Sequence, residues 1–162
     1  MGRTKLIYNQ IDIGENEPVR QGLRRIPHEQ ISVLKAEVDK LHKMKAIESS
    51  ISQFASPTVL VKKKDGTMPL SIDYKKLNSI TKNAHPLPRI NNIFDTLSGS
   101  KFFFTLDLAM GYHQVEVHPD DREKTAFSTP FGLFQYNVMQ LLLATAHATF
   151  MRLITLVFSG ML

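Results

Sequence analysis

The segment KFFFTLDLAMGYHQVEV, residues 101–117, places an acidic residue, Asp107, directly after an apolar run that is rich in strand-forming residues. A carboxylate at the end of an apolar strand costs desolvation free energy unless a cation or a metal ion partners it. The segment therefore predicts a strand that ends at Asp107, with a positive charge nearby. The alternative is that Asp107 caps the short segment Leu108 to Gly111 and faces water.

The composition is that of an ordinary globular protein. Of the 162 residues, 43% are hydrophobic and 22% are charged, which favours neither disorder nor a fibrous class. The 20 Lys and Arg outnumber the 15 Asp and Glu, and the net charge of +5 slightly favours a polyanionic partner such as nucleic acid. We expect a soluble chain with no membrane partner, because no signal peptide and no membrane-spanning apolar run is visible.

The sequence shows no pattern for a zinc site, a disulfide or another catalytic site. There is no cysteine, which excludes disulfides and thiolate metal sites. The histidines form no zinc-ligand pattern, and His113 and His118 are expected to point to opposite faces of a strand. No catalytic Ser-His-Asp order and no phosphate-binding glycine loop is present.

The chain is expected to begin with an extended arm, because glycine and proline interrupt any periodic pattern in residues 1–25. After Pro27, apolar residues recur at three- and four-residue steps, the spacing of one helical face, at Ile31, Leu34, Val38, Leu41 and Met44. We therefore expect two regions: the arm over residues 1–25 and a folded domain over residues 26–162.

The rest of the chain alternates strand and helix patterns. Two β-rich runs meet at Asp65-Gly66, where glycine tolerates the positive φ of a hairpin turn. A short helix is expected over residues 90–97, with Gly99 as its C-cap. Beyond Asp107, three further strands are predicted at HQVEV, KTAFST and FQYNV, and helical periodicity returns from Ala144.

Four blocks of the chain closely resemble, in order and with matching separations, the reverse transcriptase of gypsy-type long-terminal-repeat retrotransposons: LVKKKDGTMPLSIDYKKLN, NAHPLPRINNIFDTLSG, FTLDLAMGYHQ and DDREKTAFSTPFGLFQYNVM. The resemblance runs from about Ile11 to the C-terminus. It implies an α+β, right-hand polymerase fold comprising the fingers and a partial palm, with a mixed or antiparallel sheet and packed helices, truncated C-terminally. The implied activity is RNA-directed DNA polymerisation, which transfers nucleotides to a primer 3′-hydroxyl.

The resemblance also implies site residues in the palm. Asp107 matches the first metal-binding aspartate, and the backbone carbonyl of Leu108 is its usual companion ligand; hard oxygen ligands of this kind suit Mg²⁺. Tyr112 matches the aromatic residue that lies under the incoming sugar and rejects a 2′-hydroxyl. Its simpler alternative is a packing aromatic at a helix end. Gln114 is expected to line the same nucleotide pocket.

The resemblance places further residues in the fingers. Lys63, in the run Lys62 to Lys64 before the Asp-Gly turn, is expected to hold the triphosphate of the nucleotide; otherwise such a run is a solvated strand end. Asp73 is expected to support the fingers, and Tyr74 to pack near the template.

Two departures from the family pattern argue against activity. Pro69 stands where the family has an arginine that grips the triphosphate, and proline supplies neither a charge nor a backbone donor. Residues 139–150, MQLLLATAHATF, replace a pattern close to Met-Pro-Phe-Gly-Leu-Thr-Asn-Ala-Pro-Ala-Thr-Phe. Leu142 thus stands where only glycine allows a close or positive-φ backbone. The other replacements fall at Gln140, Leu141, Thr145 and His147.

The family's Tyr-x-Asp-Asp hairpin, which supplies two further carboxylates, is expected beyond Leu162, so Asp107 alone is a poor two-metal site. Three interpretations stay open: part of a longer polymerase that is inactive as this chain, a non-catalytic remnant that binds nucleic acid, or a reading frame without function. The partners implied are an RNA/DNA template-primer, deoxynucleotides and the remaining palm, thumb, RNase H and integrase of a Pol polyprotein. The implied location is intracellular, in cytoplasmic particles or the nucleus.

Overall fold

The computed structural model describes residues 2–61, 68–82, 99, 101–102, 105 and 107–159. Its helices are α1 (His28–Lys43), α2 (Lys75–Ile80) and α4 (Ala146–Phe158), with 3₁₀ helices η1 (Gly111–Gln114) and η2 (Pro119–Thr125). Its strands are β1 (Tyr8–Asn9), β2 (Ile47–Ser49), β3 (Ser56–Leu60), β4 (Leu70–Ile72), β5 (Glu116–Val117), β6 (Phe127–Thr129) and β7 (Gly132–Tyr136). None of the helices in these described ranges combines the length and apolar character needed to cross a membrane.

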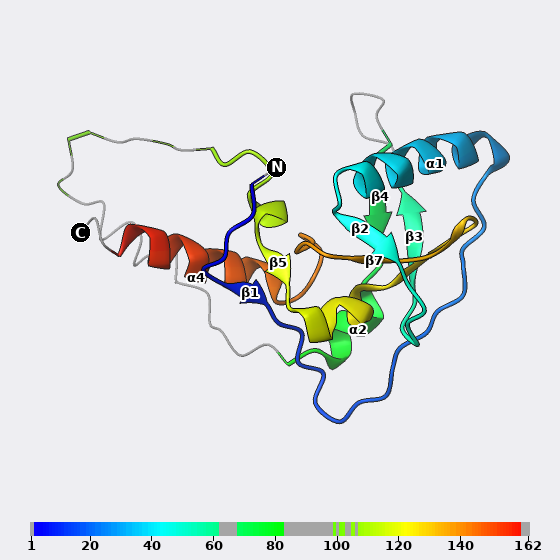
Figure 1. Ribbon diagram of the computed structural model, residues 1–162, viewed down its shortest axis with the longest axis horizontal. Helices are drawn as coiled ribbons and strands as arrows, with labels where there is room; N and C mark the ends of the chain where they lie inside the picture. Colours follow the sequence, from blue (N-terminus) through cyan, green and yellow to red (C-terminus); the bar gives the residue numbers. More distant parts are fainter. Residues whose placement is uncertain are drawn as a thin grey trace.

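The main sheet is mixed and has five strands in the order β2-β7-β6-β3-β4. Strands β3 and β6 pair in parallel, and the other neighbours pair antiparallel. Helix α1 contacts β2 and β4 and lies along the top of this sheet in Figure 1. A second, two-stranded sheet joins β1 to β5 in parallel, and β1 contacts α4. The chain is therefore α+β with a mixed sheet and packed helices, as expected.

Helix α1 forms where the apolar spacing predicts it, and it buries Leu34 and Val38 against the sheet. It ends in a Schellman motif: the N–H of Lys45 donates to the carbonyl of His42 at 2.9 Å, and that of Ala46 to Leu41 at 2.9 Å. This motif requires a left-handed residue, and here Lys45 adopts it with φ +55°. Glycine takes this conformation without the steric cost that a Cβ atom brings.

We expect Lys45→Gly to raise the free energy of unfolding by about 0.5 to 1 kcal/mol, because the relief of Cβ strain exceeds the extra freedom of glycine in the unfolded chain. Urea unfolding measures the change. The control is Lys43→Gly in the last turn of α1, which should lower stability because that residue is helical. A Lys45→Gly chain less stable than the wild type would contradict the prediction.

A buried hydrogen-bond network joins η2 to both halves of the main sheet. The Tyr74 hydroxyl donates to the carbonyl of Thr125 at 2.8 Å, and the Thr125 hydroxyl accepts from the N–H of Tyr136 at 2.9 Å. Tyr74 is only 2% exposed, and burial raises the pKa of its hydroxyl. The Tyr74 side chain is thus part of the core, and the expectation that it packs near a template stays a prediction.

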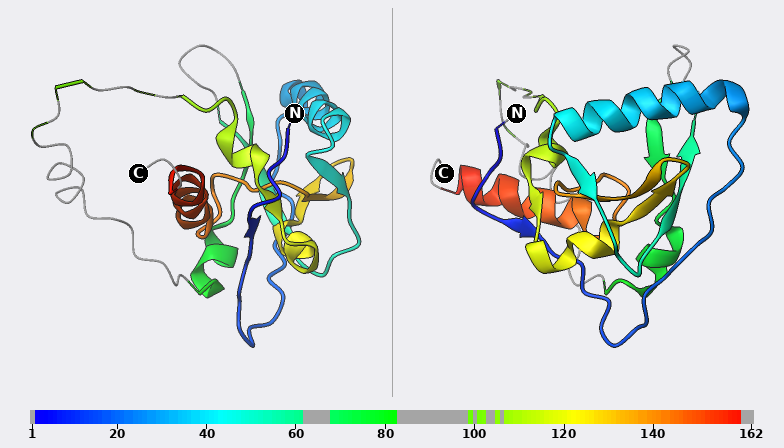
Figure 2. Two further views of the ribbon diagram at one scale, coloured as in Figure 1. Left: turned by 60° about the vertical axis from the view of Figure 1, so that its left-hand side comes forward. Right: turned by 45° about the vertical axis from the view of Figure 1, so that its right-hand side comes forward.

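The N-terminal arm is extended and packs into the core. Ile11 and Ile13 are buried, and a carboxylate and an amine hold the backbone of Ile11 from both sides. Asp121 Oδ2 accepts from the Ile11 N–H at 2.8 Å, while Lys124 Nζ donates to the Ile11 carbonyl at 2.8 Å and pairs with Asp121 at 2.5 Å. Figure 2 shows the arm, in dark blue, running beside α4. The domain boundary at residue 25 stays a prediction.

Asp121→Ala should lower the free energy of unfolding by about 2 to 3 kcal/mol, because it leaves the buried Ile11 N–H without an acceptor and Lys124 without its counter-charge. Urea unfolding and the rate of proteolysis within the arm measure the effect. The matched control is Asp120→Ala, since the Asp120 side chain is 88% exposed. Equal effects of the two variants would show that the contact to Ile11 contributes nothing.

The structure corrects two predicted strands. Lys101, Phe102, Thr105 and Asp107 are not in strand conformation, and Phe102 is 83% exposed. No strand in the described ranges pairs with them, and an unpaired segment cannot satisfy the backbone hydrogen bonds of a sheet. The desolvation argument for Asp107 therefore fails, because this carboxylate is exposed.

The predicted strand HQVEV is reduced to Glu116–Val117, because His113 lies in η1 and His118 follows β5. The argument from opposite strand faces is therefore wrong. The strands at KTAFST and FQYNV and the helix after Ala144 are confirmed as β6, β7 and α4. Strands β3 and β4 pair antiparallel, as a hairpin requires. The Asp65-Gly66 turn and the predicted helix over residues 90–97 lie outside the described residues.

Candidate functional site

Four of the residues that the sequence singled out line one pocket. It has a volume of about 650 Å³ and is lined by Thr4, Asp107, Leu108, Gly111, Tyr112, Gln114, Phe150, Leu153, Ile154, Val157 and Phe158. Asp107 and Leu108 lie in the segment that leads into η1, and Tyr112 and Gln114 belong to η1. Helix α4 supplies the apolar wall. The third expected nucleotide-binding residue, Lys63, lies outside the described residues.

Tyr112 is fixed at its ring and at its hydroxyl by α4. The ring stacks on Phe150, with centroids 4.7 Å apart and planes inclined by 19°, and the hydroxyl lies 3.3 Å from Nδ1 of His147. Gly111 permits this packing, because a Cβ atom there would lie 2.9 Å from the Phe150 ring. Met110 precedes it with φ +52°, an unfavourable left-handed conformation for a residue with a side chain.

A second pocket, of about 300 Å³, shares Tyr112 with the first and is lined by Leu108, Met110, Gly111, Tyr112, His113, Gln140 and Leu141. Gln140 Nε2 lies 3.1 Å from Nε2 of His113. Burial lowers the pKa of His113, and the contact with Gln140 opposes this shift. The neutral imidazole is therefore favoured on this side of Tyr112. Gln114 lines the first pocket and not this one, and its Nε2 donates to the Ala109 carbonyl at 3.1 Å.

The residues present do not make up a complete Mg²⁺ site. Within the part of the chain that the structure describes, no three His, Cys, Asp or Glu residues lie close enough together to hold a metal ion. Asp107 and the adjacent carbonyl of Leu108 would supply two oxygen ligands, whereas Mg²⁺ prefers six in near-octahedral geometry, several of them often water. The family uses divalent metals, but the remaining protein ligands would have to come from elsewhere.

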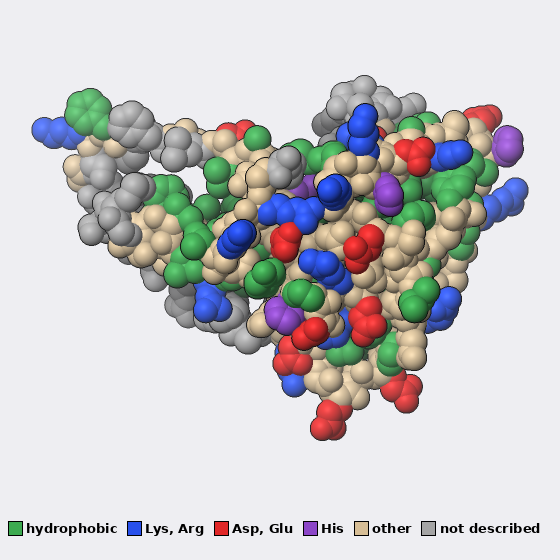
Figure 3. Space-filling model, viewed as in Figure 1, with side chains coloured by type: hydrophobic (Ala, Val, Ile, Leu, Met, Phe, Trp, Pro, Cys, Tyr) green, Lys and Arg blue, Asp and Glu red, His purple; other side chains and the backbone are tan. Residues whose placement is uncertain are grey.

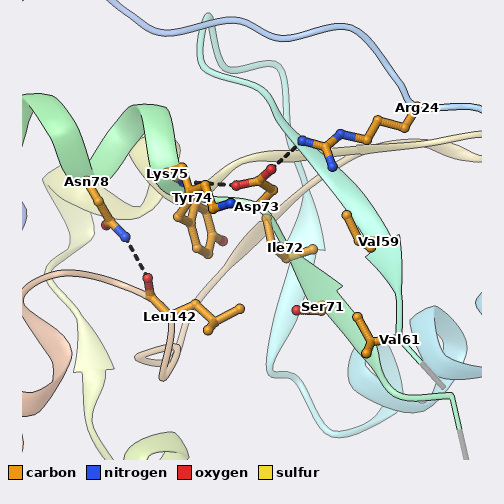
Figure 4. Close-up of a pocket in the computed structure, with 10 residues that line it drawn as sticks. All are labelled: Arg24, Val59, Val61, Ser71, Ile72, Asp73, Tyr74, Lys75, Asn78 and Leu142. Atoms are coloured by element: carbon orange, nitrogen blue, oxygen red, sulfur yellow. Dashed lines mark hydrogen bonds and ion pairs between the residues drawn. The ribbon is translucent and has the colours of Figure 1, made fainter. Parts of the chain in front are cut away.

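A third pocket lies between the arm, β3, β4 and α2. It has a volume of about 340 Å³, and Figure 4 shows its ten lining residues: Arg24, Val59, Val61, Ser71, Ile72, Asp73, Tyr74, Lys75, Asn78 and Leu142. Arg24 forms an ion pair with Asp73, which also accepts from the backbone N–H of Lys75 at 3.2 Å. Asp73 thus ties the arm to the end of β4.

Asn78 of α2 holds the segment that departs most from the family pattern. Its Nδ2 donates to the carbonyl of Leu142 at 2.8 Å, and its Oδ1 accepts from the N–H of Ala144 at 2.9 Å. Leu142 does not have a positive φ, so the backbone here makes no demand for glycine. Pro69 directly precedes β4, and the pairing of β4 with β3 ends at Leu70 and Leu60, one residue from Pro69. Proline has no N–H to extend that ladder.

Sequence reasoning missed the roles of three residues. Gln140 and His147 stood out only as departures from the family pattern, and the structure places both against residues of the site. Asn78 gave no signal, because its contacts lie more than sixty residues away. On the face shown in Figure 3, Lys and Arg lie interspersed with Asp and Glu.

The architecture is that of solved reverse transcriptases. The chain aligns over 98% of its length, with a TM-score of 0.85 and 22% identity, to the crystal structure of prototype foamy virus protease-reverse transcriptase, and covers 22% of that chain. A foamy viral protease-reverse transcriptase in complex with RNA/DNA hybrid aligns over 98% of this chain and 22% of that one, with a TM-score of 0.85 and 19% identity. Identities this low establish the fold alone.

Residues 61–161 match the profile of the family described as Reverse transcriptase (RNA-dependent DNA polymerase), and the chain belongs to that family. It is 38% identical over 162 residues to the retrovirus-related Pol polyprotein from transposon 412 of Drosophila melanogaster, with 96% of this chain and 13% of the polyprotein covered. It is 36% identical over 126 residues to the transposon Tf2-3 polyprotein of Schizosaccharomyces pombe, with 77% and 10% covered. The chain therefore spans about a tenth of these relatives, and the resemblance to retrotransposon reverse transcriptases is confirmed.

Gly111→Ala should lower the free energy of unfolding by about 1 to 2 kcal/mol, because the added methyl group pushes against the Phe150 ring that carries Tyr112. Thermal unfolding measures the loss, and the Tyr112 ring resonances should move. The control is Gly22→Ala, because nothing lies within 4 Å of a Cβ atom built at Gly22. The prediction fails if both variants behave like the wild type.

Proposed function

We propose that the chain is the fingers and the first part of the palm of an RNA-directed DNA polymerase, and that it does not polymerise by itself. Asp107 and the Leu108 carbonyl are the residues proposed to take part in Mg²⁺ binding. Tyr112 and Gln114 are proposed to line the nucleotide pocket, with Lys63 on the triphosphate. The other carboxylates would come from the rest of a Pol polyprotein.

The observation that carries this proposal is the shared pocket of Asp107, Leu108, Tyr112 and Gln114. These residues were chosen from the sequence by their match to the family, not by their positions in space. Their position around one cavity supports the proposal that all four act together in binding a nucleotide and its metal ion. The pocket also has an aromatic wall in Tyr112 and Phe150, suited to the flat faces of a sugar and base.

The proposed lack of polymerase activity rests on the metal ligands. A two-metal phosphoryl transfer needs carboxylates on both sides of two ions about 3.5 to 4 Å apart. The described residues near Asp107 supply one carboxylate. Translation of the transcript beyond the codon for Leu162 tests the origin of the others: two adjacent aspartates in a predicted hairpin would support the proposal, and their absence would contradict it.

We expect the chain to bind dATP weakly in the presence of Mg²⁺, and Tyr112→Ala to weaken that binding about tenfold, because it removes the aromatic wall of the pocket. Shifts of the Gly111 amide resonance during titration measure the affinity. The control is Tyr8→Ala, a half-exposed tyrosine outside the pocket. Unchanged affinity in Tyr112→Ala would reject the pocket as the nucleotide site.

A second candidate function is nucleic-acid binding without catalysis. Arg24 and Lys75 both line the third pocket, which we assign to the fingers, and a solved relative of the same fold is in complex with RNA/DNA hybrid. Side chains that neutralise phosphates release counterions, so the affinity should fall steeply as salt rises.

Arg24→Gln should lower the affinity for an RNA/DNA hybrid and reduce the slope of log affinity against log salt by about one, because one phosphate contact is lost. Fluorescence anisotropy over a salt series measures both quantities. Arg25→Gln is the matched control, since Arg25 is the exposed neighbour that does not line the pocket. Binding that is absent or independent of salt would reject this function.

A further inference from the structure

His147 stands where the family pattern has proline. His147 lies in the first turn of α4, three residues before Phe150. Residues three apart on a helix project from the same face, so both side chains reach the same neighbour. That neighbour is Tyr112 of η1, whose ring stacks on Phe150 while its hydroxyl lies 3.3 Å from His147 Nδ1.

We propose that His147 is a positioning residue for Tyr112, and that His147 and Phe150 together set the shape of the sugar side of the nucleotide pocket. Stacking alone leaves a tyrosine ring free to slide over its partner, because the attraction depends weakly on lateral offset. A hydrogen bond at the far end of the ring removes that freedom. With Nε2 protonated, Nδ1 of His147 accepts the proton of the Tyr112 hydroxyl. Proline at this position has no group that could do so.

The orientation of Tyr112 affects two cavities, since its ring borders both the pocket of Asp107 and the pocket of His113 and Gln140. A change in ring position therefore enlarges one cavity at the cost of the other. The inference rests on the proposed function to this extent: if the pocket takes a deoxynucleotide, the fixed ring determines how well a 2′-hydroxyl is excluded.

The backbone that carries His147 is itself firmly held. Asn78 bonds to Leu142 and Ala144, directly before α4. Thr145 and Thr149 donate to Oδ1 of the buried Asn9 at 2.9 and 3.0 Å. The first turn of α4 thus has fixed contacts on both sides of His147. A residue that acts as a support needs such an anchored backbone.

The first test needs no nucleotide. In the isotope-labelled chain, the ¹⁵N resonance of His147 Nδ1 should move in Tyr112→Phe, which removes only the hydroxyl, and should stay unchanged in the control Tyr8→Phe. An Nδ1 resonance that Tyr112→Phe leaves in place would overturn the inference, because the two side chains would then not be hydrogen-bonded in solution.

The second test measures the preference for dATP over ATP, both with Mg²⁺. His147→Ala should reduce the preference about two- to tenfold, the range expected for one neutral hydrogen bond. His147→Asn should restore it, because the Asn carbonyl can accept in place of Nδ1. Loss of preference that Asn does not restore, or no loss in His147→Ala, would overturn the inference. If the wild type binds neither nucleotide, the proposed function fails, while the Nδ1 measurement still decides whether His147 holds Tyr112.

Discussion

The hydrogen bonds from η2 to the backbone of the N-terminal arm are the constraint on which the rest of the structure depends. Asp121 and Lys124 satisfy both backbone groups of Ile11, and their own charges neutralise each other. Both side chains are largely buried, so the ion pair is little screened and the contact excludes alternative positions of the arm. With Ile11 fixed, β1 pairs with β5 and the following Ile13 enters the core.

The arm in turn determines where α4 lies. Asn9, fully buried two residues before Ile11, accepts two hydroxyl hydrogen bonds from the first turns of α4. Thr145, one of these donors, stands where the family pattern has asparagine. The position of α4 then places Phe150 against Gly111 and Tyr112. A series of contacts therefore connects η2 to the arm, the arm to α4, and α4 to the candidate nucleotide pocket. The residues of η2 and of the arm that make these contacts do not belong to the family's catalytic motifs.

The sequence predicted the elements whose pattern is local and left out those that depend on distant partners. Apolar periodicity predicts helices α1 and α4, and short β-rich runs around a Pro-Phe-Gly turn predict β6 and β7. Phe102 and Thr105 belong to a similar β-rich run, but a strand also needs a neighbour to pair with, and no strand in the described ranges pairs with these two residues. The buried hydrogen bond of Tyr74 was not predicted for a similar reason, because its partner Thr125 lies 51 residues away. The site residues came from family resemblance, and spatial clustering added Gln140, Asn78 and His147.

The contacts of Asn9 have a consequence for how the chain is made. Its two hydroxyl partners lie 136 and 140 residues later in the sequence. During synthesis on the ribosome, the arm emerges well before α4 and cannot complete its packing until α4 has followed it. Loop closure over such a distance is slow relative to local helix formation. Ile11 and Ile13 therefore stay exposed to solvent while the residues between the arm and α4 are synthesised, a period in which chaperones and proteases compete with folding for the same apolar segment.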